Sequence, residues 1–303
     1  MPKKNVNAHS YKTFKNAAYV IALVIIICAV LYFALDTSEQ SGLSPSDGDG
    51  GTQLEIMIMD VGQGDCILVV FETGETMLID ASTKSSAETI INRLDSRGIE
   101  KIDIMVATHP HADHIGGMED IVMRYDIGVI YMPDMQSSSK TYKELIAAID
   151  GKGIPVTEAY AGLDFTLGPS LCTIVSPQKD ANKDANNESI VIFLDYGETD
   201  FLFTGDVEAW GEAAILSAGY IIDADVLKVA HHGSRSGTTE EFLTAVSPEY
   251  AVISCGAGNK YGHPHEETLE LLRRYGVKTY RTDISGDIVF FADGRELNLA
   301  DAG

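Results

Sequence analysis

The order of apolar strands and amphipathic helices predicts an α/β (α+β) fold in which two β-sheets pack face to face with helices outside. Strands and helices follow one another in two blocks that look alike, and a β-rich segment separates the blocks. Each block opens with paired strands and then reaches junctions where a strand ends in histidine or aspartate. A hydrophobic content of 45% in 303 residues supplies ample apolar side chains for such a core.

The first block combines an antiparallel opening with alternating helices and strands. Apolar runs separated by Gly-containing turns predict strands at 54–61, 66–71 and 76–80. Ile90, Ile91 and Leu94 have helical spacing and predict a helix over 86–97, which Gly98 ends. The next predicted elements are a strand at 101–107, a helix at 118–125, a strand at 127–132 and a helix at 140–150 that ends at Gly151.

The second block follows a β-rich middle. Short strands are predicted at 156–160, 165–167 and 171–175, before a polar loop at 178–188 and a hairpin of 189–196 with 201–204. The remaining predicted elements are helix 208–217, strand 225–230, helix 238–246, strand 250–255, helix 266–275 and strands 277–281, 287–291 and 296–299.

The residues before the layered domain predict a membrane anchor and a linker. Residues 1–16 form a basic tail with no acid, and residues 17–35 are uncharged over a length that crosses a bilayer as a helix. The positive-inside rule then places the tail in the cytoplasm and the domain 54–303 outside a single-pass cell-membrane anchor. Residues 36–53, rich in Ser, Gly and Asp, are typical of a flexible linker. A cleaved signal peptide is the alternative, although Tyr-Phe-Ala at 32–34 fits a cleavage site poorly.

Charge and cysteine content restrict the partners. The formal net charge is −23, and the four lysines and four acids before residue 54 cancel, so the domain itself carries −23. Such a surface repels polyanions unless a basic groove or metal ions offset it locally. The four cysteines, Cys28, Cys66, Cys172 and Cys255, form no CxxC pair; a single Cys172–Cys255 or Cys66–Cys255 bridge is the alternative to free thiols.

A histidine-rich stretch follows the strand at 101–107. His109, His111, Asp113 and His114 lie within six residues, and Gly116-Gly117 follows them. Imidazole and carboxylate are ligands for borderline divalent cations such as zinc. His109 and His111 are two apart on extended chain and can face one point, while Asp113 and His114 can face a second point beside it. The stretch therefore predicts a metal site at the end of a buried strand.

Two later strand ends carry the same kind of residue. Asp206 follows the apolar strand that ends at Thr204, and an aspartate there can bridge two cations; capping the helix 208–217 is the alternative role. His231 and His232 end the strand 225–230. One of the two is expected to be a metal ligand and the other its neighbour, with a preference for His232 that the sequence alone does not decide.

These motifs together resemble the metallo-β-lactamase superfamily, over essentially all of 54–303. More narrowly, the segments Asp-Val-Gly-Gln-Gly-Asp at 60–65, Leu-Lys-Val-Ala-His-His-Gly-Ser at 227–234 and Asn-Lys-Tyr-Gly-His-Pro at 259–264 are similar to the hydrolase domain of ComEC-type DNA-uptake proteins. The resemblance implies a four-layer αββα sandwich with its site at one edge of the sheets. The multi-helix channel of ComEC proteins has no counterpart here, where one spanning segment is predicted. The phosphorylcholine esterases of the bacterial surface share similar motifs.

The resemblance also implies roles for single residues. Asp80 ends the strand 76–80 and resembles the acid that orients a ligand histidine from behind. Most hydrolases of the superfamily carry a further histidine before the bridging aspartate, but this chain has none between His114 and His231. Asn187, Glu188 or Ser189 falls in its place, which suggests looser binding, a preference for manganese over zinc, or a water there.

Two divalent cations, Zn or Mn, are thus the expected cofactors, and they would activate a water for hydrolysis. Asp113 is expected to orient that water, and His263 to protonate the leaving group or hold a phosphate oxygen; an ordinary loop histidine is the alternative. Ser234, Asn259, Gln63 and Asn187 are the candidate substrate-binding residues. Gln63 and Asp65 are expected at the rim of the site, or only in a turn.

The expected function is that of an extracytoplasmic metal-dependent hydrolase of phosphodiesters, with DNA as the first candidate substrate. The basic residues near the motifs are few for a duplex channel: Lys228, Arg235, Lys260, Arg273 and Arg274. Tyr261, Trp210 and Tyr160 would instead favour a choline-like cation and a small-substrate esterase. A weakly active scaffold module of a DNA-uptake complex is the third possibility.

Overall fold

A computed structural model describes residues 51–179 and 184–300 of the chain. The predicted basic tail 1–16 and anchor 17–35 lie outside these residues, as does most of the linker 36–53. No helix within the described ranges has both the length and the hydropathy required to span a bilayer. The described residues belong to one compact unit, Gly50–Gly303.

The first sheet has eight strands in the order β15-β14-β1-β2-β3-β4-β5-β6. Alternation of side chains along β1 divides its apolar residues between two faces: Ile56 and Ile58 point toward the second sheet, and Met57 points toward the helices. Its strands are β1 (Leu54–Ile58), β2 (Ile67–Phe71), β3 (Thr76–Ile79), β4 (Lys101–Val106), β5 (Asp126–Met132), β6 (Val156–Glu158), β14 (Ile288–Ala292) and β15 (Leu297–Leu299).

The second sheet has seven strands in the order β13-β12-β11-β10-β9-β8-β7. β10, β11, β12 and β13 run parallel, so their carboxyl ends meet at the same edge of the sheet. The strands are β7 (Leu163–Leu167), β8 (Ser170–Ser176), β9 (Val191–Tyr196), β10 (Thr199–Phe203), β11 (Val226–Lys228), β12 (Tyr250–Ile253) and β13 (Lys278–Arg281).

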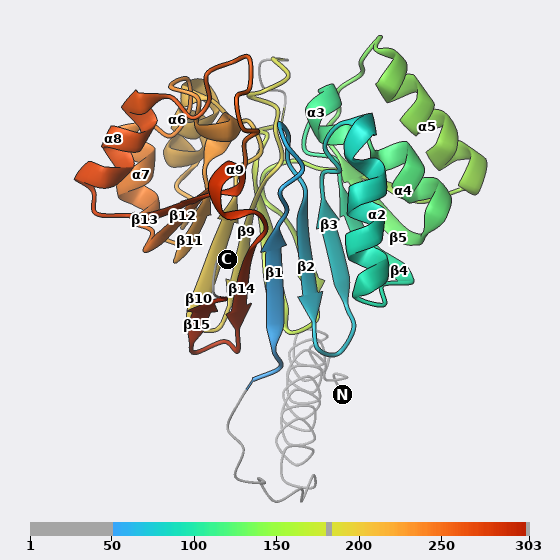
Figure 1. Cartoon of the computed structure of the whole chain (residues 1–303), viewed down its shortest axis with the longest axis horizontal. Coiled ribbons are helices and arrows are strands. Elements are labelled where there is room, and N and C mark those ends of the chain that lie inside the picture. Colours follow the sequence, from blue (N-terminus) through green and yellow to red (C-terminus); the bar gives the residue numbers. More distant parts are fainter. Residues whose placement is uncertain (1–50, 180–183, 301–303) are drawn as a thin grey trace, which may run out of the picture. The chain divides into compact units, whose positions relative to one another are not determined.

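Helices cover the outer face of each sheet, which gives the four layers that the resemblance implied (Figure 1). One group of buried apolar side chains fills the space between the sheets, and two others fill the space between each sheet and its helices. The first sheet carries α2 (Ala87–Ser96), α3 (Ala112–Ile115), α4 (Met118–Arg124) and α5 (Lys140–Lys152); the second carries α6 (Ala209–Ala218), α7 (Glu240–Val246) and α8 (Glu266–Arg274), and α9 (Thr282–Ser285) follows β13.

Several element boundaries differ from the sequence expectation for local reasons. α5 continues through Gly151 and ends at Lys152, because Gly153 adopts the left-handed conformation that ends a helix. α3 was not predicted, since only four residues of the histidine stretch form it. Cys66, Cys172 and Cys255 are free and buried, so neither alternative disulfide bridge is present.

Candidate metal centre

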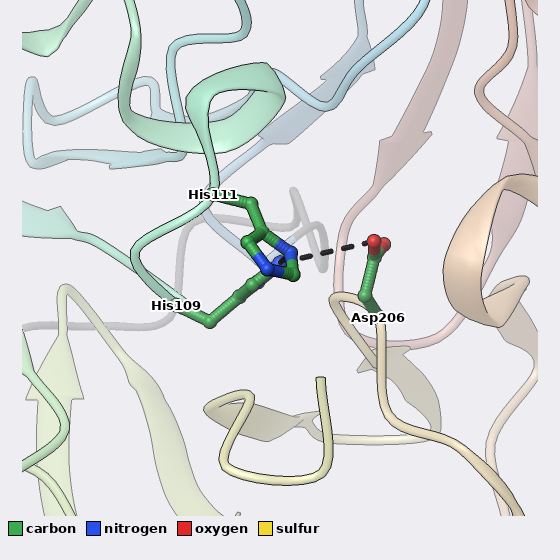
Figure 2. A group of neighbouring side chains, drawn as sticks. All are labelled: His109, His111 and Asp206. Carbon is green, nitrogen blue, oxygen red and sulfur yellow. Dashed lines mark hydrogen bonds and ion pairs between the residues drawn. The ribbon is translucent and has the colours of Figure 1, made fainter. Parts of the chain in front are cut away.

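His109, His111 and Asp206 meet at one edge of the two sheets (Figure 2). The loop after β4 delivers the two histidines, and the turn after β10 delivers the aspartate. Nε2 of His109 lies 3.0 Å from Nδ1 of His111 and 3.8 Å from Oδ2 of Asp206. The three side chains offer ligand atoms close enough to hold one cation.

A second group of possible ligands consists of Asp113, His114 and His232. Nε2 of His232 lies 3.7 Å from Oδ2 of Asp113. Oδ1 of Asp206 lies 3.2 Å from Nε2 of His114 and 3.6 Å from Nε2 of His232. Asp206 therefore directs one oxygen toward each group. A bridging carboxylate requires this arrangement, whereas the helix-capping alternative does not apply because α6 begins beyond Glu208.

His231 and His232 differ in their surroundings. His232 is 1% exposed and belongs to the second group of ligands. The His231 side chain lies nearer the solvent, with Nδ1 3.1 Å from Oε1 of Glu208 and Nε2 3.7 Å from Oδ2 of Asp206. Both residues have a positive φ, which costs roughly 1–2 kcal/mol for each L-residue. This strained turn brings consecutive side chains to the site, with His232 inside it and His231 at its edge.

Asp80 lies directly behind His114. Its Oδ2 is 2.6 Å from Nδ1 of His114 and accepts a hydrogen bond from the Thr108 hydroxyl, while Oδ1 accepts one from the Thr108 backbone N–H. The imidazole is thereby held with Nε2 directed toward Asp206. Asp80 thus lies where the resemblance implied an acid that orients a ligand histidine.

The charges of the site depend on one another. Burial alone would raise the pKa of Asp206, but the imidazoles of His114 and His232 outweigh it and hold that pKa well below its usual range. Burial would also raise the pKa of Asp113, yet hydrogen bonding to His232 and the charge of His114 lower it to about 2. Burial, and then His114, lower the pKa of His109 well below its usual range. Two carboxylates and a neutral imidazole are thus available as ligands at neutral pH.

The residues present fit divalent cations. Nε2 of His114, Nε2 of His232 and Oδ1 of Asp206 are buried, and contacts of 3.2 Å and 3.6 Å link the two nitrogens to this oxygen without a well-formed hydrogen bond. Buried polar atoms are normally satisfied, so three such atoms facing one another fit a bound cation. Nitrogen and carboxylate donors suit zinc or manganese.

A cavity of about 290 Å³ opens over these groups. Its wall is formed by Gln63, His111, Ala112, Asp113, Asn186, Asp206, His231, His232, Tyr261 and His263. Nδ1 of His263 and Nε2 of Gln63 are buried and lack a hydrogen-bond partner, so both are available to a bound molecule. Burial, and then His232 and His231, lower the pKa of His263 to about 4, so its ring is neutral at pH 7.

Three of the four predicted substrate-binding residues lie outside the cavity wall. The Asn259 amide is used within its loop, where it donates to the carbonyls of Gly256 and His263. Ser234 contacts the Ser236 hydroxyl. Oδ1 of Asn187 accepts from backbone N–H groups at the start of α6.

The structure places three other residues near the site differently from the sequence expectation or adds them to it. Asn186 lines the cavity in place of Asn187. Ser189, one candidate for the place of the missing histidine, has its hydroxyl 3.3 Å from Nδ1 of His109 and accepts the backbone N–H of Asp206. Asp65 is buried beneath His232 instead of lying at the rim. Neighbouring polar residues in a loop give no periodic signal that tells which one faces the site.

Two of the basic residues considered for DNA binding are paired with acids. Lys228 is 1% exposed and pairs with Asp65, so it cannot contact a phosphate backbone. Arg235 pairs with Glu267. A lysine inside the apolar run Val226–Ala230 was the sequence signal that this cation is buried and paired.

Comparison with known proteins agrees with this fold and site. ComE operon protein 3 of Bacillus subtilis is 30% identical over 253 residues, which cover 78% of this chain and 33% of that protein. Competence protein ComA of Neisseria gonorrhoeae is 30% identical over 291 residues, which cover 90% of this chain and 39% of that protein. The chain thus spans less than half the length of these relatives, and its similarity to competence proteins of the ComEC type is confirmed.

Among solved structures, Igni18, a novel metallo hydrolase from Ignicoccus hospitalis, has a TM-score of 0.52 at 16% identity and covers 79% of this chain and 99% of that one. At this identity the likeness shows the fold alone. The model of the metallo-beta-lactamase superfamily matches residues 59–257, which include both histidine motifs and Asp206. The chain therefore belongs to the metallo-β-lactamase superfamily.

Proposed function

We propose that this chain is a metal-dependent hydrolase of phosphodiesters, with a DNA strand as the first candidate substrate. The observation that carries the proposal is Asp206, whose two oxygens face two separate groups of ligands. His109, His111 and Asp206 would hold one cation, and Asp113, His114, His232 and Asp206 would hold the other. Two cations, zinc or manganese, supply an activated water and neutralise the charge that develops on a phosphoryl group.

The chain's own residues orient the reacting groups. The Asp113 carboxylate lines the cavity and stays ionised at neutral pH, so it can accept a hydrogen bond from the attacking water. His263 is neutral at pH 7, which favours donating a ring N–H to a phosphoryl oxygen over protonating the leaving group. Gln63 can donate its free amide N–H to a second oxygen.

The similarity to competence proteins supports DNA as substrate. The charge around the site favours single-stranded over duplex DNA. Lys228 and Arg235 are already paired, and the domain is strongly acidic. A single strand, which needs fewer phosphate contacts than a duplex, is better suited to this surface. We also propose that residues 17–35 anchor the chain in the cell membrane with the domain outside the cytoplasm.

A small-substrate phosphodiesterase related to phosphorylcholine esterases is the second candidate. Tyr261 supports it, because this half-exposed aromatic side chain lines the cavity beside His263. Against it, Lys260 already lies 4.9 Å from the centre of the Tyr261 ring, where a choline group would bind.

Hydrolysis by the purified chain tests the proposal. Single-stranded DNA, duplex DNA, bis-p-nitrophenyl phosphate and p-nitrophenyl phosphorylcholine are compared with zinc, manganese or EDTA. The Asp113→Ala variant is expected to lose activity, whereas Asp150→Ala, which changes an exposed acid of α5, is expected to keep it.

Each result has a distinct meaning. Metal-dependent loss of single-stranded DNA supports the nuclease. Cleavage of the small diesters alone supports the second candidate, the small-substrate phosphodiesterase. Metal binding without turnover of any substrate supports the scaffold and contradicts the hydrolase.

A further inference from the structure

A buried ion pair lies beneath the second group of ligands. Lys228, the last residue of β11, places Nζ 2.8 Å from Oδ2 of Asp65, and their side chains are 1% and 2% exposed. The two residues are 163 positions apart in the chain. Lys228 also donates to the Val229 carbonyl. Neither side chain can contact a substrate directly.

The other oxygen of Asp65 faces a proposed metal ligand. Oδ1 lies at ion-pair distance, 3.3 Å, from Nδ1 of His232 and makes no hydrogen bond. The same nitrogen lies 3.0 Å from the Ser254 carbonyl oxygen. Two acceptors therefore flank Nδ1, while Nε2 of the same ring faces Asp113 and Asp206.

This arrangement favours Nε2 as the nitrogen of His232 that would bind a cation. A neutral imidazole can bind a cation through Nε2 only when Nδ1 holds the proton, and acceptors next to Nδ1 favour that form. Asp80 acts in the same way on His114, but there a Thr108 hydroxyl and N–H fix the carboxylate. Behind His232 the fixing group is the Lys228 ammonium.

Stability alone is a weak reason for the pair. Removing two charges from water costs about as much as their attraction returns, so an apolar pair often serves the fold equally well. The geometry offers another reason: the Lys228 ammonium, 2.8 Å from Oδ2, holds the Asp65 carboxylate in one orientation, with Oδ1 toward His232.

We propose that Asp65 and Lys228 are positioning residues that orient His232 for metal binding: Lys228 fixes Asp65, and Asp65 holds Nδ1 of His232. The inference rests on the metal centre of the proposed function and is independent of its substrate.

Metal titration of the full chain tests this inference. Asp65→Asn/Lys228→Met removes both charges, and we compare its affinity for zinc and manganese, measured against a chromophoric chelator, with that of the unmodified chain. For each metal, we expect the ion held by the group that contains His232 to bind about 10–100-fold more weakly. Melting of the metal-free double variant is expected to stay close to that of the unmodified chain. Arg97→Met/Glu55→Gln removes a part-buried ion pair between the end of α2 and the start of β1, and is expected to leave both affinities unchanged.

Two results overturn the inference. One is that the double variant binds both ions as tightly as the unmodified chain does. The other is that the control variant loses as much metal affinity as the double variant. If the double variant does not fold, Lys228→Gln and Lys228→Met replace it. Gln retains an N–H donor toward Asp65, so weaker metal binding by the Met variant than by the Gln variant supports the inference. Unmodified affinity in Lys228→Met contradicts it. A chain that binds both cations in this Lys228-dependent way but cleaves no substrate contradicts the proposed function and leaves this inference standing.

Discussion

At the scale of single residues, Asp206 determines the geometry of the site. It is buried, and each of its oxygens lies within 4 Å of histidine nitrogens from different segments of the chain. Four imidazoles converge on this one side chain, so a change at Asp206 affects both groups of ligands at once.

Asp206→Asn is expected to lower the metal content and to reduce hydrolysis by more than about 100-fold, because a neutral amide holds a cation more weakly than a carboxylate does. Replacing a residue that only orients a ligand typically costs about 10–100-fold, and Asp206 would contact the cations itself. Metal analysis and initial rates measure the two effects. Asp150→Asn in α5 is the matched control, because that acid is exposed. Full metal content and normal rates in Asp206→Asn would exclude the bridging role.

At the scale of elements, the turn between β1 and β2 supports the histidine stretch. Gly62 and Gly64 both have a positive φ, but only Gly64 is closely packed. A Cβ on Gly64 would lie 2.3 Å from the Asp113 carbonyl oxygen and 2.5 Å from the Ser82 hydroxyl, whereas a Cβ on Gly62 would meet nothing within 4 Å. Position 64 therefore requires glycine for space as well as for conformation.

Gly64→Ala is expected to destabilise the domain by about 3 kcal/mol or more, since overpacking adds to the backbone strain. It is also expected to weaken metal binding, because the Asp113 backbone must move. Gly62→Ala should cost only about 1–2 kcal/mol, the strain alone. Urea unfolding of the two variants compares these costs; equal values would contradict the packing argument.

The hairpin of β9 and β10 carries a second testable group, Asp200. Burial, followed by the charges of Asp195 and Asp225, raises its pKa to about 6. The folded state then binds more protons than the unfolded state between pH 4 and 6, so this group's contribution to stability falls as the pH rises through that range. Above pH 6 Asp200 no longer makes this contribution to stability.

Asp200→Asn removes the partly buried charge, and its effect should depend on pH. We expect the variant to melt at a higher temperature than the unmodified chain at pH 7.5, and at nearly the same temperature at pH 4. Thermal unfolding at both pH values checks this. An equal difference at both would show that the substitution acts through packing and not through the charge.

At the scale of the whole molecule, the metal centre joins the two halves of the sandwich. Its ligands come from loops of both sheets, and the sheets otherwise meet through apolar side chains. Cations bound there would therefore stabilise the folded state by mass action, since the unfolded chain does not bring these ligands together.

Cation removal is expected to lower the melting temperature of the chain by about 5–10 °C, which corresponds to saturation at about 100 times Kd in a domain of this size. Calorimetry with EDTA, and then with excess zinc or manganese, measures the shift. The same experiment on Asp206→Asn should show a smaller shift. An unchanged melting temperature would mean that the cations do not bind between the sheets.

The sequence alone predicted the order of strands and helices and the strand ends that carry the candidate metal ligands. Periodicity and turn residues are local, so the strand ends at His109, Asp206 and His231 could be recognised without knowing their partners. The short α3 and the end of α5 were missed, because single glycines and four-residue helices give weak local signals.

Only the tertiary structure decided which distant segments meet. β14 returns to the first sheet, where Phe290 pairs with Ile56, although the preceding β13 belongs to the second sheet. The structure also places His232 inside the site and His231 at its edge, brings Asn186 into the cavity wall, and joins Lys228 to Asp65. These outcomes depend on contacts between residues far apart in the chain, and such contacts follow from packing and charge pairing in three dimensions, which no local pattern of residues encodes.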